Sequence, residues 1–206
     1  MLETWEIKGY TVEFIEDEET ETHTYLVNGV VLPSITQILK IKFGGKYNTV
    51  SQEVLKRASK LGTATHKAIE EYCKNGVESD CKELRNFKFL QKQFKFTVID
   101  NEIPIILFKD NEPVACGRLD LVLNDEEERM MLGDIKRTSV LDKEYLAYQL
   151  NLYRLGYQQC YDTEIEALKG IHLREDVRKY VDIPINEDLA MELLNKYLDE
   201  RGNEND

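Results

Sequence analysis

The chain has no long apolar run and no recognisable leader segment. None of its hydrophobic stretches is long enough to span a bilayer. The N-terminal residues, MLETWEIKGY, lack the basic and then apolar layout of a secretion signal. We therefore expect a cytoplasmic protein without a membrane partner.

Clustered cysteines are also missing. The four cysteines, Cys73, Cys81, Cys116 and Cys160, are widely spaced and form no C-x-x-C pair. The pattern therefore gives no sign of a metal–thiolate site. An intracellular chain keeps such thiols reduced, so we interpret them as buried or idle side chains.

Positive charge is scarce, with 27 basic against 39 acidic residues and a formal net charge of −12. This balance argues against a protein that coats nucleic acid with a broad basic surface. Much of the acid lies in runs at 16–21, 125–128 and 199–206, which are typical of solvated turns and chain ends. A nucleic-acid cleft in this chain would need local lysines, arginines and bound cations.

A length of 206 residues favours one domain with a single substantial core. We divide it into an N-terminal β-hairpin region (1–32), a core (33–185) and a C-terminal helix with an acidic tail (186–206). The hairpin prediction rests on Asn28-Gly29, a strong turn signal between two strand-like runs.

Periodicity and capping residues predict the order of elements. Expected strands are 10–15, 22–27, 30–32, 99–108, 114–123, 129–136, 166–173 and 179–184. Expected helices are 34–39, 51–74, 80–96, 143–161 and 186–200, with a loop at 40–48. We expect Ser34 to cap the start of the first helix and Gly76 to follow the end of the second. This order predicts an α/β (α+β-like) fold whose mixed, partly antiparallel sheet is flanked by helices.

Three charged residues follow apolar strand segments. In GRLDLVL, Asp120 shares a strand face with Arg118, while the leucines occupy the other face. In MMLGDIK, Asp134 and Lys136 are two residues apart and point to the same side. A hairpin of these strands would bring Asp120 beside Asp134.

Two converging carboxylates repel one another unless a cation lies between them. A hard cation such as Mg²⁺ prefers oxygen ligands, and Lys136 beside it would orient a water or stabilise charge on a phosphate. The pattern thus fits phosphodiester hydrolysis. The alternative is that Asp120 and Asp134 are strand-end acids with Lys136 as their salt-bridge partner.

Five short motifs occur in the order found in one enzyme family. They are Pro33–Leu39 (PSITQIL), Gly62–His66 (GTATH), Gly117–Asp120 (GRLD), Gly133–Lys136 (GDIK) and Gln149–Tyr153 (QLNLY). Together they resemble the PD-(D/E)XK nucleases, and within these the RecB-type and phage-type exonucleases. The resemblance spans roughly residues 33 to 157.

The resemblance implies a restriction-endonuclease-like core and a Mg²⁺- or Mn²⁺-dependent DNA exonuclease of phage or prophage recombination and repair. It also implies DNA as substrate, a recombination annealing protein as partner, and a homo-oligomer. Two alternatives stay open, a nuclease-like nucleic-acid-binding module that no longer cuts and an endonuclease with the same site. Because Cys160 has no C-x-x-C companions, we expect no iron–sulfur cluster.

The same resemblance assigns roles beyond Asp120, Asp134 and Lys136. It places His66 and the backbone carbonyl of Ile135 on the metal, although a helical histidine is otherwise more often structural. Glu102 is a further acid near the metal, or an edge-strand charge that aids solubility.

Gln149 and Tyr153 lie four residues apart on one helix face, in a row with Tyr145 and Tyr157. The resemblance has Gln149 and Tyr153 support the site or contact the DNA backbone, and the alternative is a packing stripe. Gly62 and Ala58 lie on the stripe of His66, where we expect small residues to let the helix approach the sheet.

Candidate phosphate contacts are basic or hydroxyl residues near these motifs, although most helical lysines are merely solvated. They are Lys40, Lys42, Lys46, Arg57, Lys60, Arg118, Arg137, Thr138 and Ser139. Phe43 and Tyr47 would stack on unpaired bases or pack in the core.

Overall fold

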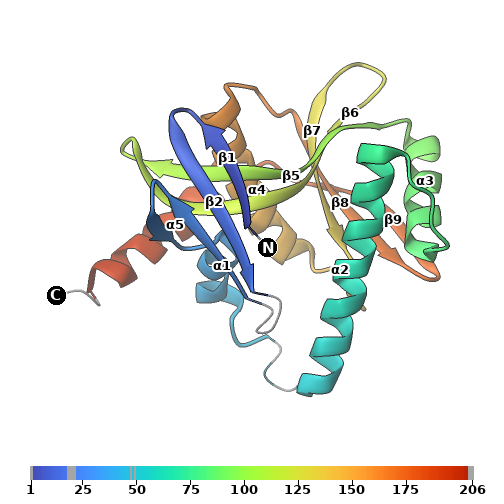
Figure 1. The fold of residues 1–206 in the computed structure, drawn as a ribbon, viewed down its shortest axis with the longest axis horizontal. Coiled ribbons are helices and arrows are strands. Elements are labelled where there is room, and N and C mark those ends of the chain that lie inside the picture. The colour runs from blue at the N-terminus through green and yellow to red at the C-terminus, as the bar shows by residue number, and fades with distance from the viewer. Residues whose placement is uncertain (1, 18–21, 47, 49, 204–206) are drawn as a thin grey trace.

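The computed structural model describes residues 2–17, 22–46, 48 and 50–203. These residues form a mixed α/β structure of the α+β kind, with two β-sheets and five helices (Figure 1). The strands are β1 (Leu2–Ile7), β2 (Tyr10–Asp17), β3 (Thr22–Val27), β4 (Val30–Leu32), β5 (Thr97–Lys109), β6 (Glu112–Asn124), β7 (Met130–Lys136), β8 (Ala167–Arg174) and β9 (Val177–Ile183). The helices are α1 (Ile35–Phe43), α2 (Gln52–Asn75), α3 (Lys82–Phe94), α4 (Lys143–Tyr161) and α5 (Glu187–Asn203).

The N-terminal region is an antiparallel sheet in the order β1-β2-β3-β4, larger than the predicted hairpin. The sequence prediction missed β1, where Glu3 occupies the inward face that it shares with Trp5 and Ile7 and so weakens the apolar alternation. Its turn to β2 has positive φ at Lys8 (49°) and Gly9 (81°), nearly the geometry of Asn28 (49°) and Gly29 (79°). Asparagine, aspartate or glycine is usual at the first of these positions, and lysine is not. Of the two turn residues, only Gly9 therefore indicates a hairpin in the sequence.

The second sheet has the order β5-β6-β7-β8-β9 and is antiparallel except where β7 pairs with β8. Helix α4 connects these two parallel strands, as a parallel connection requires. Helices α1, α4 and α5 cover one face of the sheet, and α2 and α3 cover the other (Figure 1). Their apolar side chains form a core on each face. Ile106 and Cys116 of the long β5–β6 hairpin pack against the N-terminal sheet.

Helix ends follow the predicted capping residues in several places. Ser34 forms a capping box with Gln37, and Gly76 ends α2 in the left-handed conformation. The predicted loop at 40–48 is wrong for its first part, because α1 continues to Phe43. The Phe43 ring packs edge-on against Tyr145 and Tyr148 of α4, and this tertiary contact extends the helix.

Helix α4 lies very close to the sheet at two glycines. A Cβ on Gly156 would lie 2.2 Å from Ile105 Cγ2, and a Cβ on Gly117 of β6 would lie 2.8 Å from Tyr153 Cε1. Only glycine permits both approaches. They bring the α4 row of Gln149 and Tyr153 over the β6 and β7 residues that carry the acids.

None of the described helices is both long enough and apolar enough to cross a membrane. Two of the cysteines lie in the core as expected. Cys116 is fully buried, and the Cys160 thiol donates to the Ile106 carbonyl at 3.3 Å.

Candidate active site

The β6–β7 hairpin brings Asp120 and Asp134 together as the strand pattern predicts. Leu121 pairs with Gly133, so one further step along the antiparallel register places Asp120 opposite Asp134, on the same face. Asp134 is 1 % exposed. Its Oδ2 lies 2.5 Å from Lys136 Nζ, which confirms that Asp134 and Lys136 point to one side.

Glu102 joins the two aspartates from the neighbouring strand. It lies between the pairs Asn101–Leu121 and Ile103–Leu119, and therefore opposite Asp120. Its φ of 53° is in the left-handed region, which is uncommon for a strand residue. Arg118 Nε contacts Glu102 Oε2 at 2.7 Å, and another nitrogen of Arg118 contacts Glu3 Oε1 at 3.1 Å.

Helix α2 contributes His66, whose ring lies beside the strands that carry Glu102, Asp120 and Ile135. Its Nε2 lies 3.1 Å from the Ile135 carbonyl oxygen, which can only accept, so Nε2 carries the hydrogen. Nδ1 faces the two carboxylates, 3.7 Å from Asp120 Oδ1 and 3.8 Å from Glu102 Oε1. It can bind a cation once its proton has left. The ligand-type atoms of His66, Glu102 and Asp120 all lie within 4.8 Å of one another.

Burial disfavours the ionised carboxylates of this cluster and therefore raises the pKa values of its aspartates. Burial, together with the Asp120 carboxylate and against the opposing effect of Lys136, raises the pKa of Asp134 to about 6. Burial also raises the pKa of Asp120, despite nearby His66 and Lys136. Burial alone would lower the pKa of His66, but the Asp120 and Glu102 carboxylates outweigh it and raise that pKa to about 9.

This donor set fits a divalent cation. Two carboxylates and a neutral imidazole nitrogen suit Mg²⁺ or Mn²⁺, and a cation would relieve the repulsion that raises the aspartate pKa values. The Ile135 carbonyl accepts from His66 and so fixes the ring, as the supporting partners of metal-bound histidines do. Direct ligation by Ile135 or Asp134 stays a prediction.

Gln149 and Tyr153 face this cluster from α4, and both are buried. Burial raises the pKa of Tyr153 well above its usual value, and the charges of Tyr25, Asp120 and Asp134 add to the effect. The Gln149 side chain hydrogen-bonds Tyr153, while its Oε1 has no hydrogen-bond partner. The two side chains thus pack in the core beside the aspartates, and their role at the site stays a prediction.

A cleft of ≈ 1030 Å³ leads to the cluster between α2 and the segment after β7. His66, Ile135 and Lys136 lie in its wall. Among the residues that the structure describes, six basic residues line it against a single acid, Asp142; they are Lys46, Arg57, Lys136, Arg137, Lys143 and Arg174. The acidic chain therefore has the local positive charge that a phosphate backbone requires.

The predicted phosphate contacts fall into different environments. Arg57, Arg137, Thr138, Ser139 and Lys46 line the cleft, whereas Lys40 and Lys60 are exposed and do not. Several of the candidates are already paired: Arg118 with Glu102, Arg137 with Glu83 at 2.7 Å, Lys42 with Glu144 and Lys46 with Asp142. Phe43 packs in the core, and Tyr47 lies outside the described residues.

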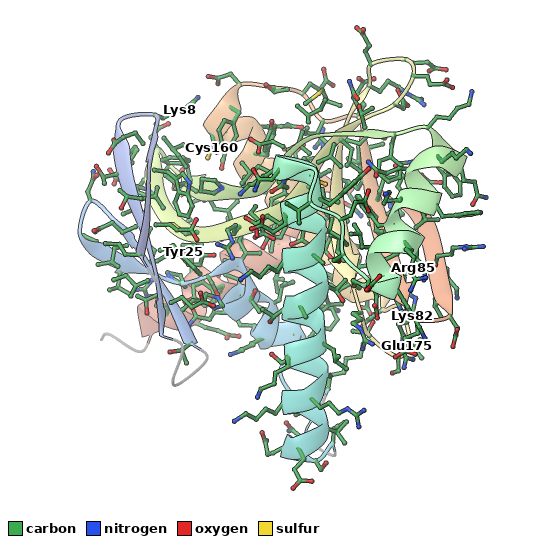
Figure 2. The ribbon with its side chains drawn as sticks, turned by 45° about the vertical axis from the view of Figure 1, so that its right-hand side comes forward. Lys8, Tyr25, Lys82, Arg85, Cys160 and Glu175 are labelled. Atoms are coloured by element: carbon green, nitrogen blue, oxygen red, sulfur yellow. The ribbon has the colours of Figure 1, made fainter. Side chains whose placement is uncertain are left out.

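The expected packing role of Gly62 and Ala58 is wrong. A Cβ on Gly62 would meet nothing within 4 Å, and Ala58 is exposed. Both line the cleft together with Val54 and Leu61, because the N-terminal half of α2 projects beyond the sheets (Figure 2). Beside α2, Lys82 Nζ at the start of α3 lies 3.2 Å from Glu175 Oε2 in the β8–β9 turn (Figure 2).

His172, Arg174 and Lys143 were missed in the sequence. His172 pairs with Lys136 across the parallel strands and so lies on the same face. Arg174 and Lys143 line the cleft. The alternation of GIHLR in a predicted strand could have placed His172 on one face, but the sequence does not reveal which strand is its neighbour.

Comparisons with known proteins identify no family. No family model matches the chain, and no curated protein matches it. Among solved structures, it is similar to the crystal structure of SSO0001, with 14% sequence identity and a TM-score of 0.47, over 80% of this chain and 74% of that one.

Proposed function

We propose that the chain is a divalent-cation-dependent deoxyribonuclease with a restriction-endonuclease-like core of the PD-(D/E)XK type, acting as an exonuclease. One observation carries the proposal. His66, Glu102, Asp120, Asp134 and Lys136 converge from three strands and a helix beside a cleft rich in basic residues. The ordered motifs of the sequence support the same activity.

His66, Glu102 and Asp120 would hold the cation, with Asp134 beside them. The cation supplies Lewis acidity toward a phosphoryl oxygen and lowers the pKa of water. Lys136 donates to a phosphate oxygen and stabilises the negative charge that develops there, helped by the low exposure of the site. The basic residues of the cleft bind the flanking phosphates.

Tyr153 and Gln149 act as positioning residues. Tyr153 is wedged against Gly117 and so fixes the strand that carries Asp120. The buried, unpartnered Oε1 of Gln149 is a free acceptor next to this ring. It is available to orient a water or a protonated group at the site.

The test uses end-labelled linear DNA and covalently closed circles, with Mg²⁺, Mn²⁺ or EDTA. We expect metal-dependent loss of the linear DNA alone. Asp120→Asn and Lys136→Gln should each lower the rate at least about 100-fold. Asp110→Asn removes one acidic charge at an exposed turn and should leave the rate unchanged.

Each other result has a defined meaning. Cutting of closed circles would identify an endonuclease. Binding of Mn²⁺ without cleavage of any DNA would contradict the proposed nuclease activity and leave a binding module. Cleavage that persists in EDTA, or in Asp120→Asn, would overturn the site itself.

A further inference from the structure

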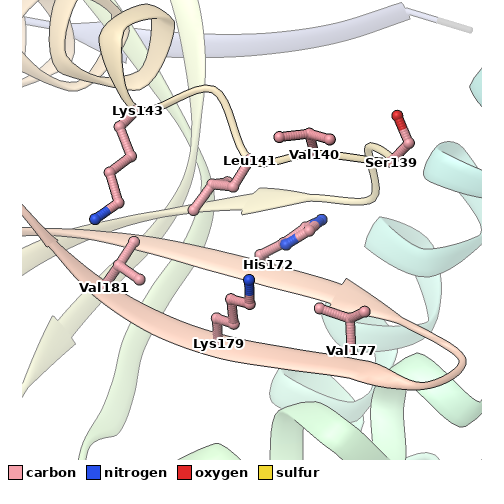
Figure 3. A pocket seen from close by; sticks show the side chains of 8 residues that line it. All are labelled: Ser139, Val140, Leu141, Lys143, His172, Val177, Lys179 and Val181. Carbon is pink, nitrogen blue, oxygen red and sulfur yellow. The ribbon is translucent and has the colours of Figure 1, made fainter.

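A second pocket of ≈ 320 Å³ lies beside the cleft, between the start of α4 and the β8–β9 hairpin (Figure 3). It shares Ser139, Val140, Leu141 and Lys143 with the wall of the cleft. Its floor continues the face of the active centre, because Lys136 pairs with His172 and His172 pairs with Lys179. Neighbouring strands are about 4.8 Å apart, so the pocket begins one strand away from Lys136.

The pocket attracts anions. Lys143 and Lys179 point toward its space (Figure 3), and no carboxylate is among its lining residues. Among the residues that the structure describes, neither lysine forms an ion pair. Two exposed ammonium groups on one pocket, without a counter-charge among the described residues, favour an anion such as a phosphate group.

A buried polar atom in the same pocket also lacks a partner. His172 is 2 % exposed, and its Nε2 donates to the Thr138 carbonyl at 2.7 Å. Its Nδ1 is therefore left as an acceptor, is buried, and has no hydrogen bond in the structure. A buried acceptor of this kind calls for a donor such as a ligand hydroxyl.

The rest of the lining is aliphatic, with Val140, Leu141, Val177 and Val181. A lone phosphate ion would leave most of the pocket empty, whereas pockets of this size suit small organic ligands. The pocket thus offers a cationic end, an acceptor and an apolar wall. These complement the phosphate, the sugar hydroxyl and the base of one nucleotide.

We propose that this pocket binds a nucleoside monophosphate unit, as a free mononucleotide or as the terminal nucleotide of a strand whose neighbouring bond lies at Lys136. The strand-end form rests on the proposed nuclease function. The binding of a free mononucleotide does not.

The first experiment measures binding of nucleoside 5′- and 3′-monophosphates to the full chain in EDTA by calorimetry. We expect binding that weakens about tenfold or more in Lys179→Gln, since a charge-assisted hydrogen bond is lost. Lys92→Gln on the exposed face of α3 removes the same charge and should bind as the wild type does.

Three results would overturn the proposal. The wild type could bind no mononucleotide up to about 1 mM. Lys179→Gln could bind as tightly as the wild type. Inorganic phosphate could bind as tightly as the mononucleotide, which would show that the apolar wall and His172 contribute nothing.

The second experiment separates the two sources of the ligand. Linear DNA with a phosphorylated end and with a hydroxyl end is digested by the wild type and by Lys179→Gln. A lower KM for one end that disappears in Lys179→Gln assigns the pocket to the strand end. An end preference that persists in the variant assigns the pocket to the free mononucleotide alone. The absence of any digestion leads to the same assignment and, separately, refutes the proposed nuclease activity.

Discussion

His66 offers only one nitrogen to a ligand, because the other is bound to the Ile135 carbonyl. The ring is thereby held with Nδ1 toward Asp120 and Glu102. The hydrogen bond to the Ile135 carbonyl is the structural role considered for His66. Its Nδ1 carries a proton between the two carboxylates when no cation is bound, because they raise its pKa to about 9. A cation that replaces this proton would add the proposed ligand role to the same side chain.

Glu102 is the residue whose role the sequence left most open. If it is a ligand, Glu102→Gln should weaken Mn²⁺ binding about tenfold or more, because an anionic oxygen is lost from the donor set. Isothermal titration in metal-free buffer measures this. Asp110→Asn serves as the matched loss of one charge, and an unchanged affinity in Glu102→Gln would reduce Glu102 to the partner of Arg118.

Glu83 and Arg137 form a largely buried pair between α3 and the end of β7. Burial would raise the pKa of Glu83, but the hydrogen bond and charge of Arg137, together with a backbone hydrogen bond, outweigh it and hold that pKa below its usual 4.5. The pair therefore stabilises the fold above pH ~4.5, and this contribution disappears as the pH falls through the lowered pKa.

Glu83→Gln should accordingly lower the free energy of unfolding by about 2 kcal/mol at pH 7. The difference from the wild type should shrink below pH ~4, because the wild-type carboxyl is then protonated as well. Urea unfolding at several pH values measures it. A difference that stays constant from pH 7 to pH 3 would show that the charge of Glu83 contributes nothing.

At the scale of single elements, two helical glycines behave in opposite ways. Gly156 of α4 is pressed against β5, whereas Gly62 of α2 faces the open cleft. Helix α4 is thus fixed to the sheet that carries the acids. Helix α2 is fixed only in its C-terminal half, where Thr65 and Ile69 are buried.

Gly156→Ala should destabilise the protein by about 1–3 kcal/mol, because its Cβ would overlap Ile105 and force the helix away from the strand. Gly62→Ala should stabilise it by up to about 1 kcal/mol, because alanine favours a helix and meets no obstacle. Denaturant unfolding compares the two variants. Equal effects would mean that α4 does not approach β5 as closely as described.

At the scale of the whole molecule, charge is separated rather than balanced. The net charge is −12, yet the lining of the cleft has six basic residues and one acid. The net negative charge disfavours nucleic acid on the protein surface in general, while the basic lining of the cleft favours it there. Binding should therefore be local and strongly dependent on salt.

Each phosphate contact releases counterions and steepens the dependence of affinity on salt. In the non-cleaving Asp120→Asn background, Arg57→Gln and Arg174→Gln should each reduce the slope of log affinity against log salt by about 0.7 for a single strand. Fluorescence anisotropy at several salt concentrations gives the slope. Lys92→Gln should leave it unchanged, and a slope that is the same in all variants would place the DNA elsewhere.

Alternation and capping act within a few residues, so local patterns in the sequence were sufficient to predict several features. These are the strand pair of GRLDLVL and MMLGDIK, the helix caps at Ser34 and Gly76, and the α+β order of elements. The chain by itself therefore determined that Asp120, Asp134 and Lys136 would meet. The resemblance also placed His66 and Glu102 near the metal, with structural roles as the alternatives, and the tertiary structure shows both beside Asp120. Only the tertiary structure decided that Gly62 faces a cleft and that His172 lies beside Lys136. These contacts depend on strand order and helix placement, which arise from packing between segments far apart in the sequence.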